Sequence, residues 1–233
     1  MSKLSIIRGN IFTTNAQTIV NTVNCVGVMG AGIALECKFR YPEMFQNYRL
    51  ACSRGEIRIG AVSLHKTSPK WVLNFPTKTH WKDPSQLRFI ESGLEDFVEK
   101  WAGLGIESIA FPLLGAQNGG LDSRDSEKIM VGYLRDLGIP VEIYHFDPAA
   151  PDDLFETFKA RVIDTSDDIL VSSTGIRRDL LARVRNSLAN SRIRQIHMLA
   201  KEPGIGERTL ERVFAYCVQP PATTLPKQID LGL

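Results

Sequence analysis

Along the first two thirds of the chain, short apolar runs alternate with segments whose apolar residues recur every three or four positions. Runs rich in β-branched residues and bounded by turn residues predict strands. They lie at residues 5–7, 18–22, 59–65, 71–75, 108–111 and 141–146. The helical spacing predicts helices at residues 33–41 (continuing through 51), 86–104 and 123–137. Strands that alternate with helices predict an α/β fold with a mixed, mostly parallel sheet between helices.

After residue 147 the strand pattern ends and helical spacing takes over. Residues 147–153 are rich in proline and aspartate, which predicts a linker or a turn before a helix. Helices are expected at residues 153–163, 177–189, 193–200 and 207–218, followed by an irregular Pro/Thr-rich tail at 219–233. Because Pro203-Gly204 separates the last two, residues 193–213 predict a helix–turn–helix. We therefore expect an α/β domain at residues 1–150 and a small, mainly helical region at residues 151–233.

Composition narrows the class of protein. Of the 233 residues, 43% are hydrophobic and 23% are charged, which is typical of a soluble globular protein, and the net charge is only +2. The chain has neither an apolar run of membrane-spanning length nor the apolar core of a signal peptide, so a cytoplasmic protein without membrane contact is expected. The four cysteines show no CxxC spacing, which predicts reduced thiols and no metal site.

The most informative candidate for chemistry is the glycine-rich loop that follows the strand at residues 18–22. Glycines at positions 27, 30 and 32 let backbone N–H groups approach phosphate oxygens at the start of a helix. Asn21 and Asn24 lie three residues apart just before this loop, where their side chains can bind sugar hydroxyls. The stretch therefore predicts a nucleotide-sugar ligand.

A second glycine-rich loop, residues 115–122, follows the strand at residues 108–111 and should lie at the same edge of the sheet. Two such loops facing each other would hold a diphosphate from both sides, whereas either alone is equally a tight turn. The first loop lacks the GxxxxGK[ST] pattern of P-loop NTPases. It contains GVMGAG, but no acidic residue ends a second strand at the spacing of dinucleotide-binding folds, which disfavours NAD-dependent redox chemistry. No cofactor is expected.

Lys78 and Asp122 are the candidates for catalysis. Lys78 lies near Phe75 and Trp81 in sequence, and desolvation there would favour a neutral, nucleophilic amine. The alternative is a lysine that balances phosphate charge or lies in solvent. Asp122 ends the second loop, where a carboxylate can act as general base or stabilise a developing oxocarbenium ion, but it also suits a helix N-cap. Cys25, like the histidines, is interpreted as a loop or packing residue.

Residues 4–147 resemble a macrodomain, the ADP-ribose-binding fold, over its whole length. The resemblance is carried by Arg8-Gly9-Asn10-Ile11 and by residues 20–24, 30–34 and 115–122. Among macrodomains the chain is similar to the DarG antitoxins of DarT/DarG toxin–antitoxin systems, through residues 21–34, 74–81 and 118–122. This implies a hydrolase that removes ADP-ribose from DNA bases, with thymidine in single-stranded DNA as the expected substrate, after a toxin has attached the ADP-ribose. The implied partners are ADP-ribosylated single-stranded DNA, ADP-ribose and a cognate DarT-like toxin.

The resemblance also implies roles for particular residues. It places the catalytic lysine at Lys78, next to Thr77, and an assisting aspartate at Asp122. In one mechanism of the related glycohydrolases the lysine attacks the anomeric carbon of the distal ribose and forms a covalent imine, which the aspartate helps to resolve. Ligand contacts are implied for Asn10 and Ile11 (adenine), Asn24 (distal ribose), and the backbone amides of Gly30, Ala31, Gly32, Ile33, Gln117, Asn118, Gly119 and Gly120 (phosphates), with Asn21, Thr77 and Gly115 in the same site.

Two positions depart from the family pattern. Many macrodomains have an aspartate where this chain has Asn10, so the adenine would lose a charged acceptor, and charged acceptors make the stronger hydrogen bonds. DarG-like chains often have an aromatic residue after Gly-Leu-Asp, whereas this chain has Ser123. Neither departure removes the expected chemistry.

Three other functions stay open at the level of sequence. The chain could bind ADP-ribosylated ligands without cleaving them, or hydrolyse ADP-ribosylated carboxylates or O-acetyl-ADP-ribose. It could also be a transcription factor that senses a nucleotide.

The helical region has an excess of positive charge. Between residues 177 and 212 there are nine basic residues and four acidic ones. That excess suits contact with DNA phosphates, and docking on a toxin or a structural role are the alternatives for the helical region.

Overall fold

The computed structural model describes residues 3–218 of the chain. Its strands form a six-stranded sheet in the order β1-β6-β5-β2-β4-β3, and each neighbouring pair is parallel except β3 with β4. The bounds are β1 Leu4–Gly9, β2 Thr18–Asn24, β3 Ser63–His65, β4 Trp71–Lys78, β5 Ile109–Pro112 and β6 Val141–Phe146. The predicted α/β fold with a mixed, mostly parallel sheet is therefore confirmed.

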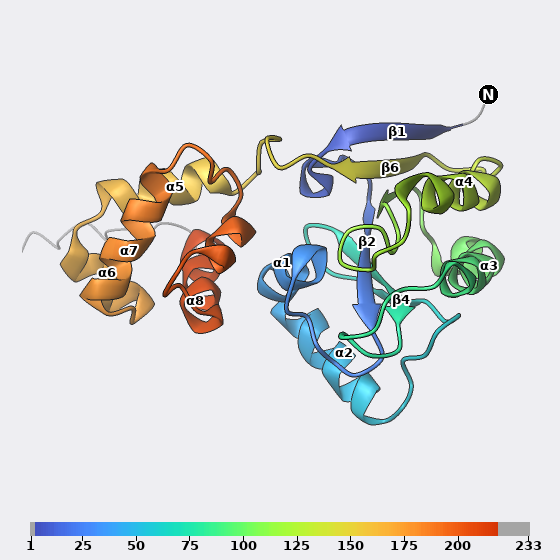
Figure 1. Cartoon of the computed structure of the whole chain (residues 1–233), viewed down its shortest axis with the longest axis horizontal. Helices are drawn as coiled ribbons and strands as arrows, with labels where there is room; N and C mark the ends of the chain where they lie inside the picture. The colour runs from blue at the N-terminus through green and yellow to red at the C-terminus, as the bar shows by residue number, and fades with distance from the viewer. Residues whose placement is uncertain (1–2, 219–233) are drawn as a thin grey trace, which may run out of the picture.

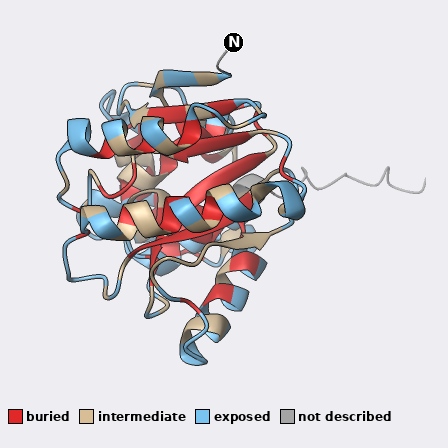
Figure 2. Cartoon of the chain, turned by 90° about the vertical axis from the view of Figure 1, so that its right-hand side faces the viewer, coloured by how far each residue is buried: buried red, intermediate tan, exposed pale blue. Residues whose placement is uncertain are grey.

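Helices cover both faces of this sheet, as Figure 1 shows. Helices α1 (Gly32–Arg40) and α2 (Pro42–Ser53) pack on one face, and α3 (Leu87–Leu104) and α4 (Ser123–Leu134) on the other. A short 3₁₀ helix, η1 (Ile11–Thr13), follows β1. Successive side chains of a strand point to opposite faces, so Ile19 joins the core under α1 and α2 while Val20 joins the core under α3 and α4. Strands β2, β4, β5 and β6 are mostly buried, the edge strands β1 and β3 are exposed or half-buried, and the outer faces of the helices are exposed (Figure 2).

The C-terminal region packs around a core of its own. Its elements are α5 (Phe155–Asp164), α6 (Asp167–Thr174), α7 (Arg178–Ala189), the 3₁₀ helix η2 (Ile196–Lys201) and α8 (Glu207–Val218). This core continues into α1, because Leu35 and Phe39 belong to the same buried cluster. The ring of Phe39 lies 5.0 Å from that of Phe214 on α8. Helix α1 is therefore covered by the sheet on one side and by the helical region on the other (Figure 1).

A buried ionic network joins the two regions beside this apolar contact. Arg40 Nη2 lies 2.6 Å from Glu36 Oε1 and 3.2 Å from Asp152 Oδ1. His197 Nδ1, on η2, lies 2.8 Å from Glu36 Oε2. Burial opposes ionisation of Glu36, but the hydrogen bond from His197 and the charge of Arg40 outweigh it and hold the pKa of Glu36 below its usual value. The charged glutamate therefore belongs to the docked arrangement.

The structure corrects four of the expected elements. The helix expected from residue 33 through 51 is two helices, because Pro42 begins a new helix at its first position. The strand expected at 59–65 is limited to Ser63–His65, since Gly60 has a positive φ of 76° and turns the chain just before it. The first helix of the expected helix–turn–helix is the 3₁₀ helix η2, although the turn at Pro203-Gly204 is present.

The fourth correction is α6, which was not expected because Ser172, Ser173 and Thr174 weaken the helical pattern. The boundary expected near residue 150 lies between β6 and α5. The tail expected at 219–233 lies outside the described residues. None of the helices found between residues 3 and 218 is long and apolar enough to cross a membrane.

The ionic network makes the free energy of unfolding depend on pH, and the substitution Asp152→Asn tests the contribution of one carboxylate. Burial and the charge of Glu36 raise the pKa of Asp152 from 3.8 to about 6. Folding therefore takes up a proton between about pH 4 and about pH 6, and the contribution of Asp152 to stability falls as the pH rises through this window. We expect Asp152→Asn to gain stability relative to wild type, on the order of 2 kcal/mol, between about pH 4.5 and about pH 7, measured as urea midpoints.

Asp153→Asn is the matched control for this prediction. Although burial opposes its ionisation, hydrogen bonds from Arg40 hold the pKa of Asp153 below its usual value. Its contribution to stability is present at neutral pH and is lost as the pH falls through the lowered pKa, so the neighbouring variant should lose stability at about pH 7. The same pH trend in both variants would contradict the assignment.

Candidate functional site

The candidate site is built at the carboxyl ends of the parallel strands, where the two glycine-rich loops lie. The first loop, residues 25–31, connects β2 to α1, and the second, residues 113–122, connects β5 to α4. Loops that leave the carboxyl ends of parallel strands share one edge of the sheet and are the usual ligand sites of open α/β folds.

Asn24 shapes the first loop from within. Its Oδ1 accepts hydrogen bonds from the backbone amides of Val26 (3.1 Å) and Val28 (3.3 Å), and its Nδ2 donates to the carbonyl of Val28 at 2.5 Å. The Tyr48 hydroxyl, on α2, donates to the backbone carbonyl of Asn24 at 2.7 Å. The side chain predicted to lie against the distal ribose is therefore also the support of the loop.

The start of α1 leaves a row of backbone donors unused. Within the described part of the chain, the amides of Gly30, Ala31, Gly32 and Ile33 have no hydrogen-bond partner. Ala31 occupies the N-cap position and has no side chain that could satisfy them. Unused amides at a helix N-terminus, together with the positive end of the helix dipole, favour an anion.

The second loop presents a similar set of donors. The amide of Leu121 donates to Gly115 O (3.0 Å), and Ser85 N donates to Gly119 O (2.9 Å). These bonds hold the loop in a tight curve, and a Cβ added to Gly119 would lie 2.1 Å from the Gly115 carbonyl oxygen. Among residues 3–218 nothing accepts from the amides of Gln117, Asn118 and Gly119, so these donors are free for a ligand.

The two loops are in contact with each other. Gly32 has a φ of +56°, and a Cβ placed there would lie 2.6 Å from Asn118 Nδ2, so only glycine fits without a shift. The Lys78 ammonium donates a hydrogen bond to the carbonyl oxygen of Asn118. The structure therefore brings the unused amides of both loops and Lys78 together, as two facing phosphate loops require.

Lys78 ends β4 beside the end of β2. It pairs with Asn24 in the parallel register of the two strands, and its own carbonyl oxygen lies 3.4 Å from Cys25 Sγ. Burial, followed by the nearby Cys52 thiol, raises the pKa of Cys25 above its usual value. A thiol with a raised pKa is a poor nucleophile, which supports the interpretation of Cys25 as a loop residue.

Asp122 caps helix α4. Its Oδ1 accepts from the backbone amides of Arg124 (2.8 Å) and Asp125 (3.2 Å), while the residue itself and the following Ser123 are exposed. The capping role considered from sequence is therefore present. Within the described residues Oδ2 has no partner, so half of the carboxylate is available for another task.

Asn10, Ile11 and Asn21, predicted as ligand residues, are engaged or buried, as Asn24 is. Asn10 is 4% exposed; its Oδ1 accepts from the Phe12 amide at 3.1 Å and its Nδ2 donates to the Pro151 carbonyl at 3.3 Å. Ile11, beside it, is buried as well. Asn21 is fully buried, and its Nδ2 donates to Asn74 Oδ1 across the β2–β4 pair at 2.9 Å. An effect of Asn21 on a ligand would have to pass through the first loop.

Sequence reasoning missed the residues that support the loops. Tyr48 stands on the apolar face of α2, where the helical spacing shows only a core residue, and Ser85 follows Asp83-Pro84 in a helix-start signal. Both are buried. The Tyr48 hydroxyl donates to the backbone carbonyl of Asn24 and also lies 3.2 Å from its side-chain Oδ1, whereas Ser85 bonds to the second loop through its backbone amide. The predicted Thr77 and Gly115 are also buried, whereas Gly120 is exposed with a φ of +77°.

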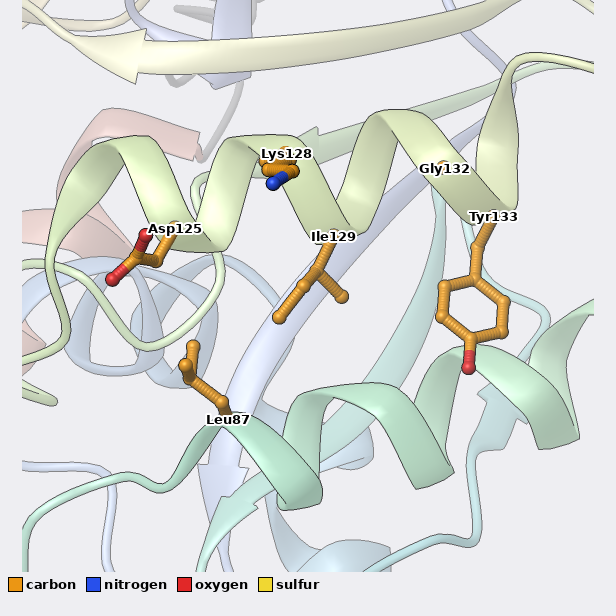
Figure 3. A pocket seen from close by; sticks show the side chains of 6 residues that line it. All are labelled: Leu87, Asp125, Lys128, Ile129, Gly132 and Tyr133. Carbon is orange, nitrogen blue, oxygen red and sulfur yellow. The ribbon is translucent and has the colours of Figure 1, made fainter.

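One hollow lies outside this site and another borders its first loop. The first, of about 460 Å³, separates α3 from α4 and is mostly apolar; Figure 3 shows the six residues that line it. The second, of about 400 Å³, is lined by residues 27–30 of the first loop and by residues of α1, α2 and α8, with Lys38 paired to Glu211 at 3.1 Å. No group of three or more His, Cys, Asp or Glu residues within 3–218 is arranged to hold a metal ion.

A family model and a curated relative both match the part of the chain that contains the candidate site. The family model described as Macro domain matches residues 20–130. A Mycobacterium tuberculosis protein named DNA ADP-ribosyl glycohydrolase is 48% identical over 133 residues, which are 55% of this chain and 38% of that protein. This chain thus spans well under half the length of that curated relative.

Solved structures extend the comparison to the fold. The macrodomain of Mycobacterium tuberculosis DarG is 45% identical with a TM-score of 0.57, and the match covers 60% of this chain and 96% of that one. Thermosipho africanus DarTG in complex with ADP-ribose is 38% identical with a TM-score of 0.59, covering 62% of this chain and 41% of that one. With a matching family model, a matching fold and facing glycine loops at the strand ends, the chain belongs to the macrodomain family.

Proposed function

We propose that this protein is an ADP-ribosyl glycohydrolase that removes ADP-ribose from bases of single-stranded DNA, thymidine first among them. The observation that carries the proposal is the convergence of Lys78 with the unpartnered amides of the two glycine loops. The 48% identical relative named DNA ADP-ribosyl glycohydrolase supports the choice of DNA as substrate. We also propose a role as cytoplasmic antitoxin against a DarT-like toxin. This role is a proposal because the chain matches only 38% of that relative's length.

The loops would hold the diphosphate through their backbones. Donors from Gly30–Ile33 would bind one side of the diphosphate and donors from Gln117–Gly119 the other, with the Lys78 side chain next to the second loop through its hydrogen bond to the Asn118 carbonyl. Preorganised N–H groups need no rearrangement when the anion binds. We expect the adenosine end at Asn10 and Ile11, and the distal ribose near Asn24 and Lys78.

Lys78 would act on the anomeric carbon of the distal ribose. A neutral amine attacks this carbon, the bond from carbon to the base nitrogen breaks, and the base leaves with a proton. The resulting lysine adduct opens to an imine, which water hydrolyses to release ADP-ribose and restore the amine. The free Oδ2 of Asp122 would accept the proton of that water or stabilise positive charge at the ribose.

Lys78→Ala should abolish turnover and preserve ligand binding. We expect kcat on an oligonucleotide carrying ADP-ribosyl-thymidine to fall at least about 100-fold, while the Kd for ADP-ribose changes little. A denaturing gel measures the first and calorimetry the second. Lys128→Ala, an exposed lysine on α4 that lines the hollow of Figure 3, is the control and should retain full activity.

The same assay separates the rival functions. Turnover by Lys78→Ala at the wild-type rate would remove Lys78 from the mechanism. Tight ADP-ribose binding by a wild type that cleaves neither DNA nor protein substrates would establish a binding module, a possibility favoured by the structural partners that Lys78 and Asp122 already have. Cleavage of ADP-ribosylated carboxylates or O-acetyl-ADP-ribose alone would change the substrate and keep the site.

Asp122 offers a substitution that separates capping from catalysis. Asparagine caps helices about as well as aspartate, so Asp122→Asn should keep the stability of the wild type and lose turnover by about 100-fold. Asp122→Ala should lose turnover equally and also about 1 kcal/mol of stability. Unfolding in urea and kcat on the modified oligonucleotide give the two readouts, and full activity of Asp122→Asn would leave the residue with capping alone.

Gly32 tests the diphosphate cradle. Alanine at position 32 would keep a φ of +56° only under strain, and its Cβ would displace the tip of the Asn118 side chain, so Gly32→Ala should turn the first amides of α1 and raise the Kd for ADP-ribose at least about 10-fold by calorimetry. Gly103→Ala, on α3, where an added Cβ meets nothing within 4 Å, is the control. Unchanged affinity in Gly32→Ala would show that the first amides of α1 do not hold the ligand.

A further inference from the structure

The order of the strands sets the direction in which a bound nucleotide lies. Asn10 follows β1, whereas Asn24 and Lys78 end β2 and β4. Four strand spacings separate β1 from β4 in the order β1-β6-β5-β2-β4, which is about 19 Å at about 4.8 Å each. Under the proposed function, a ligand with adenine at β1 and its distal ribose at β4 therefore has the group attached to that ribose near the carboxyl end of β4, where residues 79–83 follow.

The chain segment beyond β4 is a fixed turn. The hydroxyl of Thr79 donates to Asp83 Oδ2 at 3.3 Å, and the amide of Asp83 donates to the carbonyl of His80 at 3.1 Å. The turn is also tied to the first glycine loop, since the amide of Cys25 donates to the Thr79 carbonyl at 3.1 Å. Residues 79–83 therefore hold a defined position directly after Lys78.

This turn exposes a large aromatic side chain. Trp81 is 49% exposed, and on the adjoining first loop Val26 is 47% exposed. The His80 ring lies 5.6 Å from the Trp81 ring at an interplanar angle of 31°, and Lys82 Nζ lies 5.1 Å from the centre of that ring. An exposed tryptophan accompanied by a cation is the combination on which single-stranded nucleic acids bind, with a base stacked on the ring and a phosphate beside the charge.

We infer that Trp81 is a stacking platform for the nucleotide next to the ADP-ribosylated one, with Lys82 beside its phosphate. The inference rests on the proposed function, because it takes single-stranded DNA as the group attached to the distal ribose. It adds a specificity-determining residue that lies outside the ADP-ribose contacts. The platform makes an oligonucleotide a better ligand than the modified nucleoside alone.

Binding measured in the Lys78→Ala variant tests this without requiring turnover. The probes are a single-stranded oligonucleotide with one internal ADP-ribosyl-thymidine, and the ADP-ribosyl-thymidine nucleoside. Adding Trp81→Ala should raise the Kd for the oligonucleotide about 10-fold and leave the Kd for the nucleoside unchanged. Trp81→Phe should recover most of the loss, since phenylalanine also stacks, and Ile169→Ala, a 54% exposed residue on α6, should change neither Kd.

The outcomes distinguish this inference from the proposed function. Failure of the wild type to cleave either probe would refute the glycohydrolase while the oligonucleotide preference could still be present and depend on Trp81. Equal affinity for the two probes, or an equal change in both with Trp81→Ala, would refute the platform even in an active enzyme. An ADP-ribosylated peptide whose binding depends on Trp81, with no such dependence for DNA, would assign the turn to a protein substrate instead.

Discussion

Helix α1 is the element on which both halves of the molecule depend. Its start presents unused amides to the candidate phosphate site, and its body is buried against the sheet on one side and α8 on the other. A short helix enclosed in this way has no freedom to tilt, so its N-terminal amides keep a fixed direction. On the side of the helical region, the buried charges of Glu36 and Arg40 are paired with each other, and Arg40 also pairs with Asp152.

Helix α1 connects the helical region to the first glycine loop, because it packs against α8 and follows directly after that loop. The same residues that dock η2 and α8 lie within two turns of Gly32, and Lys38 reaches Glu207 and Glu211 at the hollow behind the loop. Several arginines of the helical region bind other residues of the same region. Arg185 pairs with Asp167, Arg178 pairs with Asp168, and Arg212 donates to the carbonyl of Gly175. The positive excess seen in the sequence is thus partly used to hold the helices together.

The unpartnered hydrogen-bonding groups of the candidate site, within residues 3–218, belong to the backbone more than to side chains. Asn10, Asn21 and Asn24, the polar residues that attract attention in the sequence, form internal hydrogen bonds that shape the first loop or its surroundings. Among residues 3–218, the groups of this site without a partner are backbone amides and one oxygen of Asp122, and the Lys78 amine is held by the Asn118 carbonyl. A site of this kind tolerates changes of side chain and resists changes of glycine, because the curvature of the loops is what aims the donors.

The sequence alone determined the class of fold and the location of the site. Alternating strand and helix periods predict a mostly parallel sheet, and glycine loops after two of its strands are expected at the same carboxyl edge, with Lys78 at the end of a neighbouring strand. Only the tertiary structure decided which polar groups remain free. The structure shows that Asn24 bonds to its own loop and that Asn10 donates to the carbonyl of Pro151 in the distant linker. Local periodicity in the sequence does not record how such side chains are oriented in the folded protein. The same holds for the Glu36 network, since its partners come from two regions whose packing is decided by shape and burial.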